Sequence, residues 1–231
     1  MDPSAGVVAA EQRVRQKRGQ VTYDALIETC FELLREREFD QISIAELAQK
    51  AGYSVGAFYA RFRSKDELFD AMVQQHVQNR RKVRQRQFQE ANGARFLHAL
   101  LEETVNYYWG RRGFWRASLI RSIREPAFWA PIRKLSHEFA DSLIAHMASS
   151  AGRPLTAPEE ANVRFAVQLT FGTINNTIVN RPGPFFMGQA LFVQNLVRAF
   201  RLVSDYDSLV AARRPNGSKR AKSARARRPR A

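Results

Sequence analysis

The sequence is poor in the residues that build disulfides, metal sites and nucleophilic catalytic centres. It has 1 cysteine and 4 histidines in 231 residues. Cys30 has no second cysteine to pair with, and its position on an apolar helical stretch favours simple packing over a reactive thiol. No two histidines stand four residues apart, and the chain has no phosphate-binding glycine loop or nucleophile elbow. We therefore expect no enzyme activity, no cofactor and no metal site.

Long apolar runs are also missing. Apolar residues make up 45% of the chain, which is enough for a globular core, but polar residues interrupt every apolar stretch well before about 18 positions. The N-terminus has no apolar segment of the length that a signal peptide needs. These absences predict a cytoplasmic protein. Since no segment alternates apolar and polar residues over the length of a strand, the predicted fold class is all-α.

Acidic residues are few relative to basic ones. The chain has 37 Lys and Arg against 22 Asp and Glu, a formal net charge of +15. Residues 213–231 hold nine of the basic residues and no acidic one, so without them 28 stand against 22, or +6. Such an excess suits a polyanion, either nucleic acid or an acidic membrane surface, and charge alone does not choose between them. Because no amphipathic helix adjoins the tail, we expect no membrane partner.

Helical periodicity divides the chain into four regions. Residues 1–19 lack a sustained apolar period and are predicted to form a mobile arm. Residues 20–65 begin with a helix near Val21, with Thr22 as its N-cap, and continue as short helices over 43–50 and 54–62. Residues 66–210 are predicted to form a larger helical domain, and residues 211–231 a disordered basic tail. The helices expected after the one that opens at Ser64 cover 94–110, 114–123, 127–150, 158–180 and 186–208.

Residues 43–62 have the proportions of a helix-turn-helix, in which two short helices are joined by a tight turn. Ala48 must be small because the second helix crosses close to it. Gly52 is suited to the left-handed conformation at a helix end, and Phe58 anchors the second helix on the first. In such a unit the second helix lies in the major groove of DNA. The predicted capping boxes that open helices here are Ser43–Glu46 and Ser64–Glu67.

The segment ISIAELAQKAGYSVGAFYARFRSKDELFDAMV, residues 42–73, resembles the TetR family of one-component transcription regulators. The Gly-Tyr-Ser-Val-Gly-Ala-Phe-Tyr run and the Ser-Lys-Asp-Glu-Leu run that begins at Ser64 follow that family's pattern nearly position by position. With residues 21–40 included, the resemblance covers about fifty residues. It implies an N-terminal three-helix DNA-binding domain, followed by a larger helical domain that binds ligand and dimerises.

The resemblance also implies which residues face DNA. Tyr59 and Lys65 match positions that typically contact phosphates, whereas Arg61 replaces the commoner histidine and keeps a permanent charge. Without long polar side chains at the start of the second helix, base reading is expected to rely on methyl contacts, backbone approach and DNA shape. The basic residues of the N-terminal arm either contact DNA or are simply solvated. The expected DNA-binding residues are Ser43, Ser54, Val55, Gly56, Ala57, Tyr59, Arg61 and Lys65.

The last two predicted helices, 158–180 and 186–208, each carry an apolar face and are joined by a short Gly- and Pro-containing loop. Paired across a two-fold axis, these faces would form a four-helix dimer interface; alternatively they pack only within one chain. The face residues are Val163, Val167, Thr170, Phe171, Ile174 and Ile178 on the first, and Leu191, Leu196, Phe200 and Val203 on the second.

Aromatic residues crowd the segment 107–129, where they either border a ligand cavity or form plain core. Polar partners for a ligand are available on the neighbouring predicted helices, including Asn175 or Asn176. The candidate ligand-binding residues are Tyr108, Trp109, Trp115, Arg116, Trp129, His137, Phe171 and Asn175.

The sequence therefore predicts a homodimeric regulator of transcription that binds double-stranded DNA. We expect it to repress from a near-palindromic operator and to release that operator when a small, largely apolar inducer binds. An alternative is a sequence-independent DNA-compacting protein that is driven by the arginine-rich tail.

Overall fold

The computed structural model describes residues 3–91 and 95–211, with side chains from Lys17 onward except those of Arg18 and Ala211. Within these ranges the chain is helical and contains no strand, which confirms the all-α prediction. The predicted tail lies outside the described residues from position 212 on. The elements are α1 (Pro3–Leu33), η1 (Phe39–Gln41), α2 (Ile44–Lys50), α3 (Val55–Tyr59), α4 (Lys65–Gln89), α5 (Phe96–Gly110), α6 (Arg112–Arg124), η2 (Pro126–Trp129), α7 (Ala130–Ala151), α8 (Ala157–Asn180), α9 (Ala190–Ser204) and α10 (Tyr206–Ala211).

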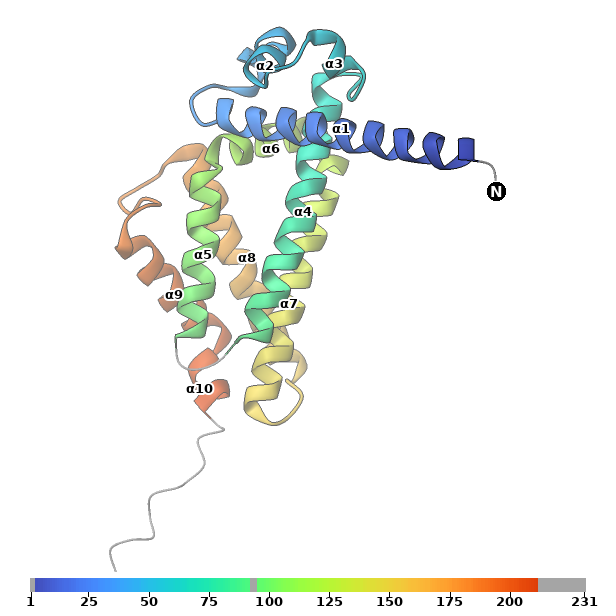
Figure 1. The fold of residues 1–231 in the computed structure, drawn as a ribbon. Helices are drawn as coiled ribbons and strands as arrows, with labels where there is room; N and C mark the ends of the chain where they lie inside the picture. The colour runs from blue at the N-terminus through green and yellow to red at the C-terminus, as the bar shows by residue number, and fades with distance from the viewer. Residues whose placement is uncertain (1–2, 92–94, 212–231) are drawn as a thin grey trace, which may run out of the picture.

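The short helices α2 and α3 sit at one end of the molecule, above α1 (Figure 1). From that end α4 runs down into a bundle formed with α5, α7, α8 and α9, and α6 lies at the junction below α1. Within the bundle, α8 packs on α9 and α7, and α4 packs on α7. The order of the parts therefore agrees with a small N-terminal helix-turn-helix unit followed by a larger helical body.

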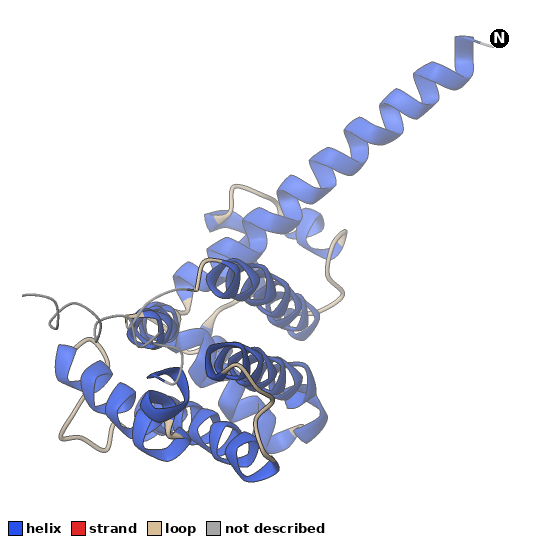
Figure 2. Ribbon diagram, turned by 90° about the horizontal axis from the view of Figure 1, so that it is seen from below, coloured by secondary structure: helices blue, strands red, loops and turns tan. Residues whose placement is uncertain are grey.

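The first helix is longer than the sequence predicted. We expected a separate arm through residue 19 and a helix that begins near Val21, but α1 starts at Pro3 and projects beyond the body (Figures 1 and 2). The predicted helix start at Thr22 is therefore wrong. The physical reason is that extending an existing helix avoids the cost of nucleation, and the segment is rich in Ala, Gln and Arg, which are good helix formers.

The last predicted helix, 186–208, is divided in two by Asp205. Its backbone is left-handed, with φ of 50°, so α9 ends at Ser204 and α10 starts at Tyr206. Asp tolerates this conformation better than most residues, and its carboxylate accepts a hydrogen bond of 2.7 Å from the Ser208 hydroxyl. The start of α9 at Ala190 also lies later than predicted, because residues 181–189 form the loop that leaves α8.

The helix-turn-helix unit is joined to the body through α6. Gly113 packs directly on the end of α1: a Cβ built at this glycine would lie 1.6 Å from the carbonyl oxygen of Leu34. The next residue, Phe114, contacts both Phe31 of α1 and Phe69 of α4, with ring centroids 5.1 Å and 5.4 Å apart. One continuous hydrophobic core therefore runs from the helix-turn-helix into the bundle.

Candidate nucleic-acid interface and ligand cavity

Both helices of the helix-turn-helix are capped by serine, as the sequence predicted. The Ser43 hydroxyl accepts a hydrogen bond of 3.1 Å from the Glu46 amide, and the Ser54 hydroxyl accepts one of 3.1 Å from the Ala57 amide. The reciprocal half of the first capping box is absent, because the Glu46 carboxylate pairs with Arg37 instead. At Ser64 the cap is also present, but the Glu67 carboxylate accepts from the Arg63 amide at 2.6 Å and leaves the box incomplete.

The turn between α2 and α3 depends on Gly52 for its conformation. Its φ is 81°, which a residue with a side chain adopts only under strain, and no atom lies within 4 Å of where a Cβ would stand. Backbone freedom rather than space therefore requires glycine here. Ala48 and Phe58 are both fully buried, so the small residue and the aromatic anchor lie where the geometry of the motif demands them.

The outer surface of α3 is open to solvent. Val55 is 41% exposed and Tyr59 is 54% exposed, and Ser54 and Gly56 are exposed beside them. Ala57 is half-buried, whereas Phe58 alone among residues 54–60 is buried. The helix is shorter than predicted and ends at Tyr59, after which the chain turns so that Phe62 enters the core. The N-terminal end of α3 is thus free to enter a groove.

Arg61 follows α3 and lies against α1. Its guanidinium approaches Gly19 so closely that a Cβ at that glycine would lie 2.7 Å from Nη2. The side chain is exposed and donates a hydrogen bond of 3.2 Å to the carbonyl of Ala60. The permanent positive charge of Arg61 is therefore displayed on the same end of the molecule as α3.

The ammonium group of Lys65 is engaged within the protein. It donates hydrogen bonds to the carbonyl oxygens of Phe39 and Ile42 at 2.8 Å and 3.0 Å, with a longer one of 3.4 Å to Asp40. It also lies 4.6 Å from the centroid of the Phe39 ring. An ammonium group has three donors, so a phosphate contact at Lys65 requires the exchange of one of these bonds. Through these bonds Lys65 holds the connection between η1 and α2 in place.

A cavity of about 570 Å³ opens between α5, the η2–α7 segment and α8. Five of the eight predicted ligand-binding residues line it, namely Tyr108, Trp129, His137, Phe171 and Asn175. Its floor is apolar and aromatic, with polar groups toward the rim, and the carboxamide oxygen of Asn175 is buried without a hydrogen-bond partner among the described residues. Such a lining is typical of small-molecule sites, whose volumes run from about 300 to 1,000 Å³.

The other three predicted ligand-binding residues do not line this cavity. Trp115 is fully buried directly behind it, stacked on Tyr108 with ring centroids 4.2 Å apart. Trp109 lies elsewhere, beside Gly188, because residues 108 and 109 point to different sides of α5. Arg116 faces the helix-turn-helix unit, where it lies 3.3 Å from the Glu38 carboxylate.

Sequence reasoning missed further residues of the cavity wall. These residues follow Trp129 and Phe171 at the spacing of three and four residues that shares a helix face along α7 and α8. That spacing could have identified them from the sequence. The additional lining residues are Ile132, Arg133, Ser136, Ala140, Arg164, Val167, Gln168 and Gly172.

The apolar faces that we assigned to a dimer interface are mostly turned inward. Val163, Val167 and Ile174 on α8, like Leu196 and Phe200 on α9, are buried within their own chain, so the prediction is wrong for these residues, whereas Leu191 of the predicted α9 face is exposed. Each helix also has exposed apolar residues. They are Phe165, Leu169 and Val179 on α8, and Leu191 and Leu202 on α9.

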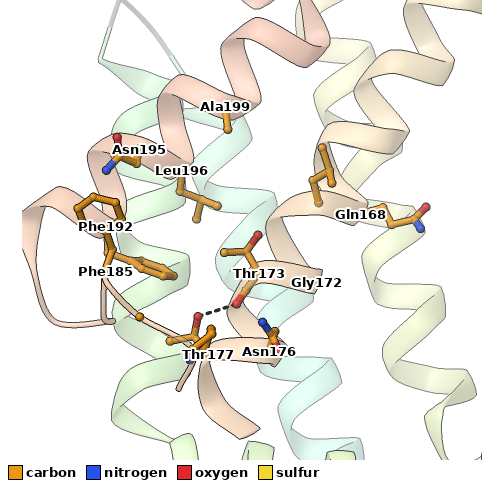
Figure 3. A pocket seen from close by; sticks show the side chains of 13 residues that line it. Gln168, Gly172, Thr173, Asn176, Thr177, Phe185, Phe192, Asn195, Leu196 and Ala199 are labelled. Carbon is orange, nitrogen blue, oxygen red and sulfur yellow. Dashed lines mark hydrogen bonds between the residues drawn. The ribbon is translucent and has the colours of Figure 1, made fainter. Parts of the chain in front are cut away.

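A groove of about 550 Å³ runs along this outer face between α8, α9 and the loop that joins them (Figure 3). Phe185 and Phe192 stand on one side of the groove, and Thr173 and Asn176 on the other. Gln168 and Gly172 belong to both hollows, so the groove and the cavity lie on either side of one stretch of α8.

No group of three or more His, Cys, Asp or Glu side chains among the described residues is arranged to hold a metal ion. None of the helices in the same part of the chain is long and apolar enough to cross a membrane.

The N-terminal segment of the chain is similar to known regulatory proteins. The profile described as "Bacterial regulatory proteins, tetR family" matches residues 26–72. The "Uncharacterized HTH-type transcriptional regulator YwcC" of Bacillus subtilis (strain 168) is 38% identical over 53 residues, which is 23% of this chain and 24% of that protein. The chain thus matches about a quarter of the length of this curated relative.

Solved structures share the whole fold at low sequence identity. A tetR-family transcriptional regulator from Streptomyces coelicolor has a TM-score of 0.63 and 19% identity, and covers 84% of this chain and 93% of its own. The transcriptional regulator FadR from Bacillus subtilis, in complex with stearoyl-CoA, has a TM-score of 0.54 and 18% identity. The match covers 82% of this chain and 98% of the FadR chain. The profile match thus identifies residues 26–72 as a segment of the tetR type, and the solved structures show that the chain shares the fold of regulators of that family.

Proposed function

We propose that this protein is a ligand-responsive repressor that binds double-stranded DNA in a sequence-specific manner. The observation that carries the proposal is the exposed N-terminal end of α3, which is capped by Ser54 and anchored through the buried Phe58. A short helix held in this way presents its first residues to base edges when it enters the major groove.

In this proposal the residues on and beside α3 divide by role. Val55, Gly56 and Ala57 face the bases, where methyl contacts and close backbone approach read sequence and shape. Tyr59 and Arg61 contact phosphates on either side, which fixes the register of the helix. Ser43 is exposed at the start of α2 and lies near the DNA backbone in this proposal. Lys65 joins the phosphate contacts only by giving up a bond to η1.

We further propose that two copies associate through residues 158–208. The exposed apolar residues of α8 and α9, together with the partly apolar groove beside them, provide a surface of the kind that homodimers bury. A two-fold axis across this surface generates two recognition helices, and therefore a near-palindromic operator with half-sites about 34 Å apart.

The cavity beside α7 and α8 is the proposed inducer site, and α6 is the proposed connection to DNA binding. Trp115 of α6 contacts two cavity residues, Tyr108 and Trp129, while Gly113 of the same helix rests on α1. A ligand that moves Trp115 thereby biases the position of α1 and α4. Coupling of this kind typically changes operator affinity about 5- to 150-fold. The FadR relative binds stearoyl-CoA, which supports a small-molecule site in this fold.

The experiment that tests the proposal is selection of bound sequences from a random DNA pool, repeated with candidate ligands. A regulator enriches one near-palindromic sequence and releases it with at least one ligand. If repeated rounds enrich no common sequence at physiological salt, the chain is not a sequence-specific regulator. That outcome favours the alternative, DNA compaction by the nine basic residues of 213–231.

A further inference from the structure

Arg84, on α4, is a charged residue in the core of the helical body. Its side chain is only 6% exposed, and its guanidinium lies over the Phe139 ring at 3.8 Å from the centroid. Nε and Nη1 are buried and have no hydrogen-bond partner among the described residues. Burial lowers the pKa of Arg84 to about 10, which still leaves it charged at neutral pH.

The neighbouring carboxylates do not compensate this charge by direct pairing. Glu103 accepts two hydrogen bonds of 2.6 Å from Arg80, and Glu138 accepts bonds of 2.7 Å and 2.8 Å from Arg81. Each of the two acids is thus already bound to another guanidinium. A buried charge without a directly paired acid costs considerable stability, so its presence calls for a reason other than packing.

The position of Arg84 provides that reason, because it lies directly behind the wall of the ligand cavity. Its guanidinium is 5.7 Å from the centroid of Phe171, and Phe171 lines the cavity. Tyr108, which also lines it, is close enough for its pKa to respond to Arg84. In surroundings of low polarity the field of an unpaired charge extends through such a wall.

The charged groups that line the cavity are also basic. Arg133 and Arg164 are at its rim, and no Asp or Glu is among the described lining residues. Arg164 is partly neutralised by Asp141, which lies 2.8 Å away outside the lining, whereas Arg133 has no ion pair with any described residue. Basic side chains without a directly paired acid therefore lie both behind the cavity wall, at Arg84, and at its mouth, at Arg133.

We propose that the cavity takes an organic anion: a flat apolar body packs against Tyr108, Trp129 and Phe171, and an acidic group is held by the field of Arg84. The inference rests on the proposed function, since it names the chemical class of ligand at the same site. A carboxylate, sulfonate or phosphate ester supplies the missing countercharge. A neutral ligand of the same shape leaves Arg84 uncompensated and is bound less tightly.

The test uses two fluorescent probes that share one body. 8-Anilinonaphthalene-1-sulfonate carries an anionic group, and N-phenyl-1-naphthylamine is its uncharged counterpart; both become brighter in apolar sites. The wild-type protein is expected to bind the sulfonate at least about tenfold more tightly. Arg84→Met is expected to lose most of this preference, while the part due to Arg133 and Arg164 and the affinity for the neutral probe are retained.

Arg86→Met is the matched control, because Arg86 lies on the same helix but is exposed. It is expected to leave both affinities unchanged. Thermal unfolding of the probe-free protein provides the second readout. Since Arg84 is buried without a partner, Arg84→Met is expected to unfold at the same temperature as wild type or a higher one, which separates loss of the anion site from loss of the fold.

The outcomes distinguish the two proposals. Equal affinity of the wild-type protein for both probes, or an anion preference as large in Arg84→Met as in wild type, overturns the inference that Arg84 selects an anionic ligand. If neither probe nor any other apolar compound binds, the proposed inducer site itself is refuted. A preference that falls in Arg84→Met and is unchanged in Arg86→Met supports the inference.

Discussion

The contact between α6 and α1 is so close at Gly113 that a single methyl group is expected to separate the two helices. A Cβ at this position would lie 1.6 Å from the Leu34 carbonyl oxygen and 2.6 Å from its carbonyl carbon. Since ordinary van der Waals contact begins near 3.5 Å, Gly113→Ala forces a displacement of about 2 Å. The atoms in the way belong to the backbone, so no side-chain rotation relieves the clash.

The expected cost follows from the size of that displacement. Overpacking in a core costs about 1–3 kcal/mol, and a clash with backbone belongs at the upper end. Gly110 is the matched control, because it lies three positions earlier in a helix and nothing stands within 4 Å of its Cβ position. Gly110→Ala is expected to gain about 0.5–1 kcal/mol from helix propensity alone. The two variants should thus differ by about 3–4 kcal/mol, or by roughly 10 °C in Tm for a chain of this size.

Urea and thermal unfolding at one fixed protein concentration measure this difference, since dimerisation makes Tm depend on concentration. The same two variants then enter a titration of operator binding with and without ligand. Gly113→Ala is expected to weaken the response to ligand, whereas Gly110→Ala is expected to keep it. If Gly113→Ala is as stable as Gly110→Ala, the close contact between α6 and α1 does not exist and the proposed connection through α6 fails.

Four further results are expected. Lys65→Met should lower the free energy of unfolding by about 1–3 kcal/mol, because its hydrogen bonds to η1 are lost; an unchanged urea midpoint contradicts the structural role of Lys65. Burial, with Arg80, Arg84 and Arg111 nearby, lowers the pKa of His76 to about 3, so the neutral ring is favoured in the folded state and stability falls as pH drops from about 6.5 toward 3. His76→Phe should reduce that loss of stability by up to about 1.4 kcal/mol per pH unit. Urea unfolding at pH 7 and pH 5 measures it, and an equal loss in the wild-type protein and the variant refutes this role of His76. Leu202→Asp, at a position 73% exposed on α9, should produce monomers in analytical ultracentrifugation, while Ile123→Asp on α6, 81% exposed, should not; a Leu202→Asp dimer of wild-type affinity rules out the α8–α9 interface. Truncation after Ala211, which retains the buried Leu209 of α10, should flatten the salt dependence of DNA binding and preserve sequence preference, whereas loss of that preference favours compaction by the tail.

Local signals explain how much of the helix-turn-helix was readable from the sequence. Serine caps, the left-handed Gly52 and the anchoring Phe58 each act within a few residues of their own position, so their spacing alone specifies α2, the turn and the start of α3. The exposed surface of α3 then follows, because a helix anchored by one aromatic side chain must turn its other side outward.

The features that depend on distant packing were less accessible. Both α8 and α9 have exposed as well as buried apolar residues, and the sequence offers no way to tell which of them face the chain's own core. The start of α1 was missed because a run of good helix formers extends a helix without needing an apolar face. The aromatic cluster pointed to Tyr108 and Trp129, and the search for polar partners to His137 and Asn175, but the charged wall was not found. Arg84 is one of many basic residues along α4, and only the tertiary fold shows that this one is buried.

The central claim is that the exposed end of α3 reads DNA, and the affinity of one variant for the selected operator tests it most directly. Val55→Glu adds a negative charge at the first residue of α3 without disturbing the buried Phe58. Ile123→Glu is the control, since it makes the same change at an exposed site on α6. At fixed salt, Val55→Glu is expected to weaken operator binding by at least tenfold, or about 1.4 kcal/mol, with Ile123→Glu unchanged. Equal affinity of the two variants would contradict the claim.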